Sequence, residues 1–74
     1  MNELILSKEV YTVRAVQSAA QAFSEICRIC INDTSDHIIC SFQMRTDIPI
    51  SQTIREFENY LIDLTVSGGF YATH

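Results

Sequence analysis

The sequence predicts a small α+β domain in which two amphipathic helices cover one face of an antiparallel β-sheet. Apolar residues recur at helical spacing in two segments, residues 13–27 and 50–64. Between these segments, residues 28–32 and 37–44 alternate or run apolar in the manner of strands, around the turn-forming cluster NDTSD. A third strand-like run, Leu4–Leu6, precedes the first helix.

Length and composition favour one domain, residues 1–74, built around one core. Apolar residues make up 47% of the 74 residues and charged residues 19%, as in a packed globular protein. A chain of this size buries only about 60% of the surface that its unfolded form exposes. A homodimer or a protein partner would therefore add stability.

The charge and the apolar runs exclude several classes of protein. Nine acidic and five basic residues give a net charge of −4, the wrong sign for a surface that binds nucleic acid. No N-terminal signal peptide is evident, and no apolar run approaches the roughly 20 residues that span a bilayer. We therefore expect a cytoplasmic protein without membrane contact, whose three cysteines stay reduced.

The first helix is expected to begin after Thr12, a residue type that caps helix N-termini. Two neighbouring apolar stripes follow along the helix. The first consists of Val13, Val16, Ala20, Phe23 and Cys27, and the second of Ala15, Ala19, Ala22 and Ile26. The alanines allow the helix to lie close to the sheet.

The next segment predicts a β-hairpin. With residues 33–36 as the loop, Asn32 opposes His37 and Cys30 opposes Ile39. Because side chains alternate across a strand, one face is apolar and packs on the helices. This core face holds Ile29, Ile31, Ile38, Cys40, Phe42 and Met44. The other, open face holds Arg28, Cys30, Asn32, His37, Ile39, Ser41 and Gln43.

The second helix is expected near Pro49, with Ser51 or a neighbour as its cap. Its apolar stripe consists of Ile50, Ile54, Phe57, Leu61 and Leu64. Gly68 and Gly69 are expected to end it, and residues 70–73 are a candidate fourth strand. The order β-α-β-β-α(-β) is typical of a ferredoxin-like α/β sandwich.

All three cysteines lie near one histidine in the pattern C-x2-C-x6-H-x2-C, residues 27–40. Zinc needs ligands that converge on one point. In the predicted hairpin Cys40 points towards the helices, whereas Cys30 and His37 point away. We therefore expect no metal ligands here. Cys27 and Cys30 also follow a helix C-terminus, where the helix dipole opposes a thiolate, which makes a redox pair unfavourable.

Other signs of catalysis are missing. The chain has no glycine-rich phosphate loop, since its two glycines are adjacent near the C-terminus. Glu56, Glu58 and Asp63 fall on the polar side of the second helix, where carboxylates usually face solvent. We expect no catalytic residues, no cofactor and no enzymatic activity.

Two segments, VYTVRAVQSAAQAF (residues 10–23) and EFENYLIDL (residues 56–64), resemble the His-Xaa-Ser system protein D family, HxsD. That family has a Tyr that opens an Ala-rich helix ending in an aromatic residue, and a later helix of the form Phe-x-Asn-x-Leu-Leu-Asp. The matching residues are Tyr11, Ala15, Ala19, Ala20, Phe23, Phe57, Asn59, Leu61 and Asp63. The chain departs from the family after Asp63, where a basic continuation is expected.

The resemblance implies an accessory protein associated with radical-SAM enzymes that modify a peptide carrying His-Xaa-Ser repeats. It carries over no catalytic residue. We therefore expect a non-enzymatic protein that binds a partner enzyme or peptide through the open face or edge of its sheet. The expected partner-binding residues are Cys30, His37, Ile39, Ser41, Asn59 and Asp63.

Two alternatives stay open. The predicted topology also occurs in ACT-like modules that bind amino acids as dimers, although the strand-to-helix turn SKEVYT has no glycine to admit a ligand against the backbone. A metal or redox protein based on Cys27, Cys30 and Cys40 is the other alternative.

Overall fold

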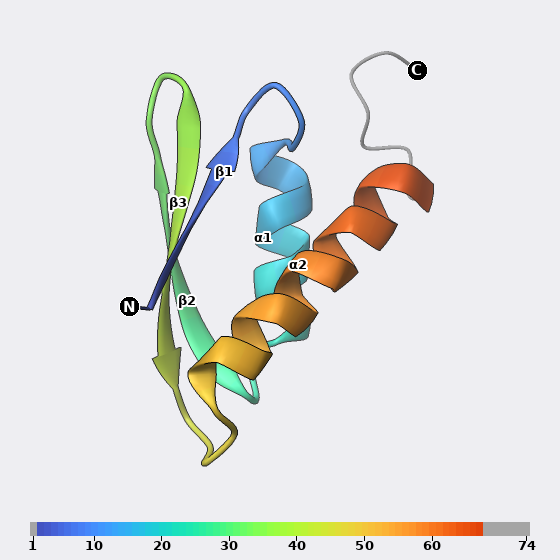
Figure 1. Ribbon diagram of the computed structural model, residues 1–74. Helices are drawn as coiled ribbons and strands as arrows, with labels where there is room; N and C mark the ends of the chain where they lie inside the picture. The colour runs from blue at the N-terminus through green and yellow to red at the C-terminus, as the bar shows by residue number, and fades with distance from the viewer. Residues whose placement is uncertain (1, 68–74) are drawn as a thin grey trace.

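The computed structural model describes residues 2–67, which form three strands and two helices (Figure 1). The elements are β1 (Glu3–Ser7), α1 (Val13–Ala22), β2 (Cys27–Asp33), β3 (His37–Met44) and α2 (Ile50–Ser67). The sheet is antiparallel with strand order β1-β3-β2, and both helices lie on one of its faces. This arrangement confirms the predicted α+β, ferredoxin-like fold.

A tight turn and a cap connect β1 to α1. The carbonyl of Ser7 accepts hydrogen bonds from the backbone N–H groups of Val10 and Tyr11. Thr12 then caps the helix, because its Oγ1 accepts from the N–H of Ala15 at 3.1 Å. The predicted cap is therefore confirmed.

The first helix ends earlier than its apolar pattern predicted. Phe23 leaves the helical conformation, and its N–H donates to the carbonyl of Ala19. A turn follows in which the carbonyl of Phe23 accepts from the N–H groups of Ile26 and Cys27. Cys27 consequently opens β2 instead of lying at the end of the helix, and its buried side chain belongs to the sheet.

The hairpin register differs from the predicted one by two residues. Cys30 lies opposite Ser41 instead of Ile39, and Asn32 lies opposite Ile39 instead of His37. Thr34 explains the difference. Its N–H donates to the His37 carbonyl at 2.9 Å, and its hydroxyl accepts from the His37 N–H at 3.0 Å, so the turn is tighter than assumed. A shift of two residues keeps every side chain on its predicted face.

Aromatic rings join the sheet to the helices in the core. Phe42 of β3 meets Phe57 of α2 edge to face, with ring centroids 5.2 Å apart, and Phe57 meets Phe23 in the same way at 5.5 Å. Ten buried apolar residues form this core: Leu6, Ala15, Val16, Ala19, Cys27, Ile38, Cys40, Phe42, Phe57 and Leu61. The helices are therefore fixed to one face of the sheet, and neither helix covers the other face.

The second helix contains two buried polar residues that its apolar pattern did not reveal. The hydroxyls of Thr53 and Thr65 donate to the carbonyls four residues earlier, at 3.3 and 2.8 Å, so both are satisfied inside the core. The helix begins at Ile50, and the Pro49 carbonyl accepts from the Thr53 N–H. Ser51 thus lies within the helix and is not its cap.

Two predictions fall on residues that are not described. The glycine stop at residues 68–69 and the fourth strand at residues 70–73 lie outside residues 2–67. Within residues 2–67, neither helix combines the length and apolar character that a membrane span requires.

Candidate partner-binding surface

The open face of the sheet lies opposite the helix layer (Figure 1). Strand alternation and the observed registers determine which side chains point to this face. They are Glu3, Ile5, Ser7, Arg28, Cys30, Asn32, His37, Ile39, Ser41 and Gln43. Four of the six predicted partner-binding residues, Cys30, His37, Ile39 and Ser41, therefore share this open face.

An apolar pair, Ile5 and Ile39, lies in the middle of the open face. The two residues are directly opposite each other in the β1–β3 ladder. Ile5 is 62% exposed and Ile39 is partly exposed. The sequence predicted that Cys30 lies opposite Ile39. In the observed register Cys30 lies opposite Ser41, and the residue of β1 opposite Ile39 is Ile5.

Ile5 is a surface residue that sequence reasoning missed. Its neighbours Leu4 and Leu6 point into the core, so alternation alone indicated that Ile5 points outward. Alternation did not reveal the residue that Ile5 contacts, because that depends on the strand order. The order places β1 next to β3, and Ile5 therefore lies beside Ile39.

Polar groups border the apolar pair. In the next row of the sheet, Cys30 lies opposite Ser41, and Ser41 lies opposite Glu3. The Ser41 hydroxyl donates to Oε2 of Glu3 at 3.3 Å. An apolar centre with a polar border is the usual composition of a protein–protein contact surface.

The outer edge of β1 presents backbone N–H and C=O groups that point away from β3. The N–H of Phe42 donates to the carbonyl of Asn2 at 2.9 Å, and that of Lys8 donates to the carbonyl of Asp36 at 3.2 Å. Because antiparallel ladder bonds alternate, the intervening residues of β1 direct their N–H and C=O groups away from β3. These are Glu3, Ile5 and Ser7. Within residues 2–67, no strand pairs with this edge.

The cysteines do not converge. Cys27 and Cys40 are fully buried on the core face, and Cys30 is exposed on the open face. Burial raises the pKa of the Cys40 thiol to about 11. Burial also raises the pKa of Cys27, with Arg45 opposing the shift. Across residues 2–67, no three His, Cys, Asp or Glu side chains are grouped so that they could hold a metal ion.

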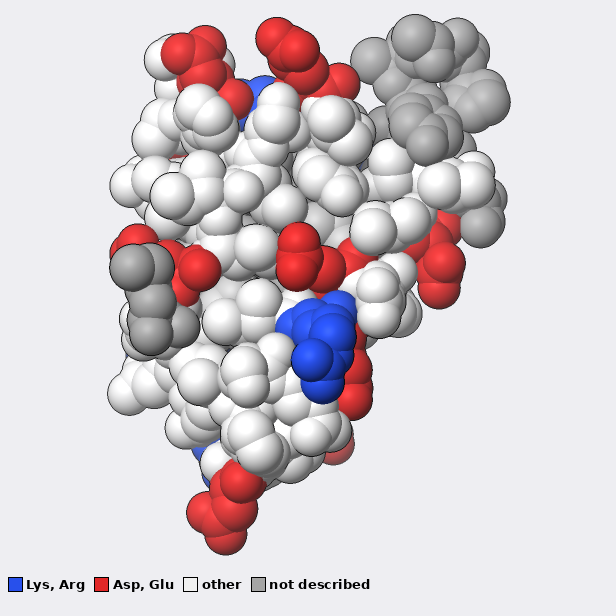
Figure 2. Space-filling view, viewed as in Figure 1, with Lys and Arg blue, Asp and Glu red and all other residues white. Residues whose placement is uncertain are grey.

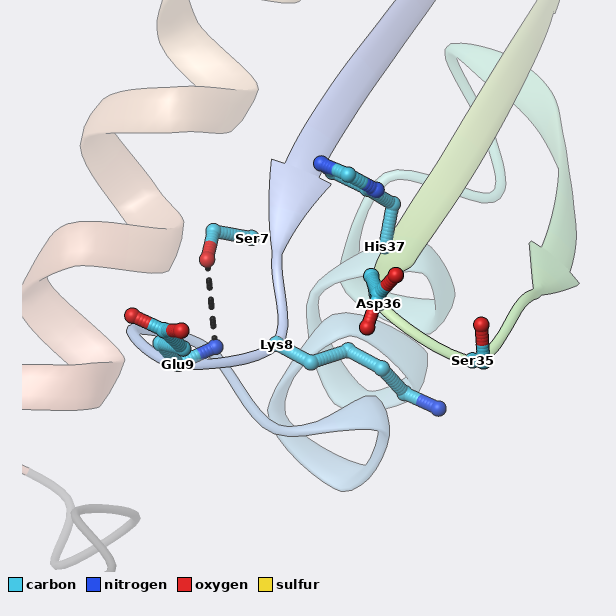
Figure 3. Close-up of a pocket in the computed structure, with 6 residues that line it drawn as sticks. All are labelled: Ser7, Lys8, Glu9, Ser35, Asp36 and His37. Atoms are coloured by element: carbon cyan, nitrogen blue, oxygen red, sulfur yellow. Dashed lines mark hydrogen bonds between the residues drawn. The ribbon is translucent and has the colours of Figure 1, made fainter.

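A polar cleft lies where the β1–α1 turn meets the hairpin loop. It has a volume of about 380 Å³ and is lined by Ser7, Lys8, Glu9, Ser35, Asp36 and His37 (Figure 3). Lys8 is engaged elsewhere, since it pairs with Asp33 and donates to the Thr34 carbonyl at 2.6 Å. Figure 3 shows the Glu9 carboxylate and the Lys8 ammonium pointing in different directions, so the charges do not converge on one point.

The other two predicted residues belong to the helix layer. Asn59 and Asp63 are exposed on α2, and α2 lies on the face of the sheet opposite the open face (Figure 1). The exposed apolar residues Ile62 and Val66 lie on the same helix, 44% and 58% exposed. The predicted set therefore occupies two separate surfaces.

Acidic side chains are spread over the face seen in Figure 2, and Lys and Arg are few there. This distribution agrees with the net charge of −4.

Comparison with known proteins identifies a family for this chain. The family model described as "His-Xaa-Ser system protein HxsD" matches residues 6–66. Searches of curated proteins and of solved structures found no match. The matched segment includes every helix and strand except the first residues of β1 and the last residue of α2. This chain therefore belongs to the HxsD family of His-Xaa-Ser system proteins.

Proposed function

We propose that this protein is a non-enzymatic accessory component of a His-Xaa-Ser system that binds a protein or peptide partner through the open face of its sheet. The partner is a radical-SAM enzyme of that system or the peptide that the enzyme modifies. The observation that carries the proposal is the pair Ile5 and Ile39, which leaves apolar surface in the middle of a face that neither helix covers.

The energetics favour a partner on this face. Covering a β-branched apolar side chain is favourable by roughly 1.5–3 kcal/mol when burial is complete. The polar border, which includes Ser41 and Glu3, supplies hydrogen-bonding groups around that centre. The outward backbone groups of β1 lie next to Ile5, so a partner segment can also add to the sheet as a further strand.

Catalysis has little support from the groups that residues 2–67 offer. Cys40 is buried with a pKa of about 11, so it is a neutral thiol at physiological pH and a weak nucleophile. The polar cleft beside His37 lacks charges that converge on one point. Recognition rather than a reaction is therefore the proposed activity, in the cytoplasm and without a cofactor.

The proposal is tested by affinity isolation of the tagged protein from its native cells, followed by mass spectrometry. The expected product is a radical-SAM enzyme or a peptide rich in His and Ser. Isolation of the chain alone would refute the partner-binding function.

The purified partner then tests the open face. Ile39→Lys introduces a charge into the apolar pair, so we expect binding to be lost while the circular dichroism spectrum stays that of the folded protein. Ile62→Lys is the matched control, since it makes the same change at an exposed position on α2. Loss of binding in Ile62→Lys, with retention in Ile39→Lys, would place the contact on the helix layer.

The polar cleft favours a second candidate, an ACT-like module that binds an amino acid as a homodimer. The cleft lies at the turn between β1 and α1, and its Glu9 and Asp36 carboxylates are acceptors for the ammonium group of an amino acid. Isothermal titration with the common amino acids distinguishes this function from the first. Saturable binding that is lost in Asp36→Asn would favour the small-molecule function.

A further inference from the structure

We propose that Arg28, Gln43 and Arg45 form an anion-binding cleft at one end of the open face, which takes a carboxylate side chain from an extended segment of the protein partner. This inference rests on the proposed function and adds the chemistry of the partner. It is carried by the register of the hairpin, by the absence of an ion pair to either arginine within residues 2–67, and by the separation of Gln43 from Ile39 along β3.

The hairpin register brings the three residues together. Arg28 of β2 lies opposite Gln43 of β3. The N–H of Arg45 donates to the Ile26 carbonyl at 2.9 Å, so the ladder continues past the last residue of β3. Arg28, Gln43 and Arg45, with Met44, line a cleft of about 240 Å³.

Neither guanidinium in this cleft has an acidic partner in the part of the chain that the structure describes. The only ion pair among residues 2–67 joins Lys8 to Asp33, at the opposite end of the hairpin. The chain carries five Lys and Arg residues against nine Asp and Glu, and two of the five meet in this cleft. Two positive charges that line the same cleft both attract an anion bound there.

The three side chains suit a carboxylate. A guanidinium presents a planar fork of N–H donors that matches the two oxygens of a carboxylate, and these charge-assisted bonds are stronger than neutral ones. The Gln43 amide is exposed in the same cleft and offers a further N–H donor.

The cleft and the apolar pair lie along the same strand, β3. Gln43 and Ile39 belong to the same strand and point to the same face, four residues apart. At a rise of about 3.3 Å per residue this separation is about 13 Å. An extended partner segment that lies along β3 therefore places an apolar residue on Ile39 and an acidic residue four positions away in the cleft.

The test uses a synthetic peptide, Ac-Ser-Ile-Thr-Ser-Thr-Glu-Ser-NH2, titrated into ¹⁵N-labelled protein and followed by NMR. We expect saturable shifts of the amide signals of Arg28, Gln43 and Arg45 and of the Arg side-chain N–H groups. Replacing the peptide's Glu by Gln, or the protein's Arg28 and Arg45 both by Gln, is expected to weaken binding by at least ~10-fold.

The matched control is the double variant Arg14→Gln/Arg55→Gln, which removes the same charge from exposed positions on the helices. It should bind the peptide like the unaltered protein. Equal loss in both double variants, or no saturable shift, would overturn the proposal. So would tighter binding of inorganic phosphate than of the peptide in the same cleft, because that result assigns the cleft to a phosphate.

The test of the anion-binding cleft can fail separately from the test of the proposed function. If the isolated partner depends on Ile39 but binds equally to the Arg28→Gln/Arg45→Gln variant, the open face binds a partner and the anion cleft is refuted. If no partner is isolated, the proposed function fails independently of the peptide titration.

Discussion

Ile5 of β1 and Ile39 of β3 lie directly opposite each other in the β1–β3 ladder, and strand alternation places both side chains on the open face. A cross-strand pair of this kind contributes roughly 0.2–1 kcal/mol to a sheet. Ile5 remains 62% exposed, so most of its apolar surface is not used by the fold. The pair therefore has more to contribute to an interface than to the stability of the monomer.

Ile5→Lys is expected to abolish partner binding as Ile39→Lys does, with a loss of folding stability below about 1 kcal/mol. The reason is that Ile5 lies on an edge strand and is largely exposed. Binding to the isolated partner and urea unfolding provide the two measurements. Val10→Lys, at a position 52% exposed in the β1–α1 turn, is the control that should bind normally. Unchanged affinity of Ile5→Lys would contradict an interface on the open face.

Phe57→Ala should destabilise the protein by about 3–5 kcal/mol, a large fraction of the stability of a small domain. Phe57 is fully buried and its ring meets Phe42 and Phe23 edge to face. Chemical denaturation followed by circular dichroism measures the loss. Tyr60→Ala is the control, because Tyr60 is 38% exposed and meets only the ring of Phe23. Equal losses for the two variants would show that Phe57 does not join sheet to helices as described.

The free energy of unfolding should decrease as the pH rises above 9, because the Cys40 thiol loses its proton more readily in the unfolded state than in the folded core. Its folded pKa of about 11 lies above the ordinary value of 9.0, so the folded state holds the thiol proton more tightly than the unfolded state does. The contribution is complete below pH 9 and is lost as the pH rises to about 11. Its magnitude is on the order of 3 kcal/mol.

Urea unfolding across this pH range measures the effect. Cys40→Ala should be less stable at neutral pH, because it leaves a cavity, and should lose less additional stability between pH 9 and pH 11. Cys30→Ala removes an exposed thiol and should keep the pH dependence of the unaltered protein. An identical slope in Cys40→Ala would rule out the buried thiol as the cause.

Thiol labelling should separate the cysteines by face. We expect a disulfide reagent to modify Cys30 in the folded protein, and Cys27 and Cys40 only after denaturation, because both are fully buried. A chromogenic reagent gives the number of thiols modified with time. Cys30→Ser should abolish the rapid phase. Two rapid thiols in the folded protein would contradict the assignment of Cys27 and Cys40 to the core face.

Much of the local structure was predictable from the sequence because it depends on near neighbours. Thr12 caps α1 as predicted, since a cap needs only a side chain and an N–H group three residues on. The faces of the hairpin were also predictable. An error of two residues in the register did not disturb them, because side chains alternate with a period of two.

The candidate surface was predictable only in part. Cys30 and Ile39 were correctly assigned to the open face. The prediction that Cys30 lies opposite Ile39 was wrong. Thr34 decided the register by closing the hairpin on His37, and turn geometry of this kind depends on a few hydrogen bonds that composition does not reveal.

By itself the sequence determined the element types, the helix cap, the composition of the two sheet faces and the resemblance to the HxsD family. Periodicity and capping encode these features within a few residues of chain. Only the tertiary structure decided that Ile5 meets Ile39 and that Arg28 and Arg45 share a cleft. These contacts join residues far apart in the chain, so they depend on strand order and register, which the packing of the whole domain selects.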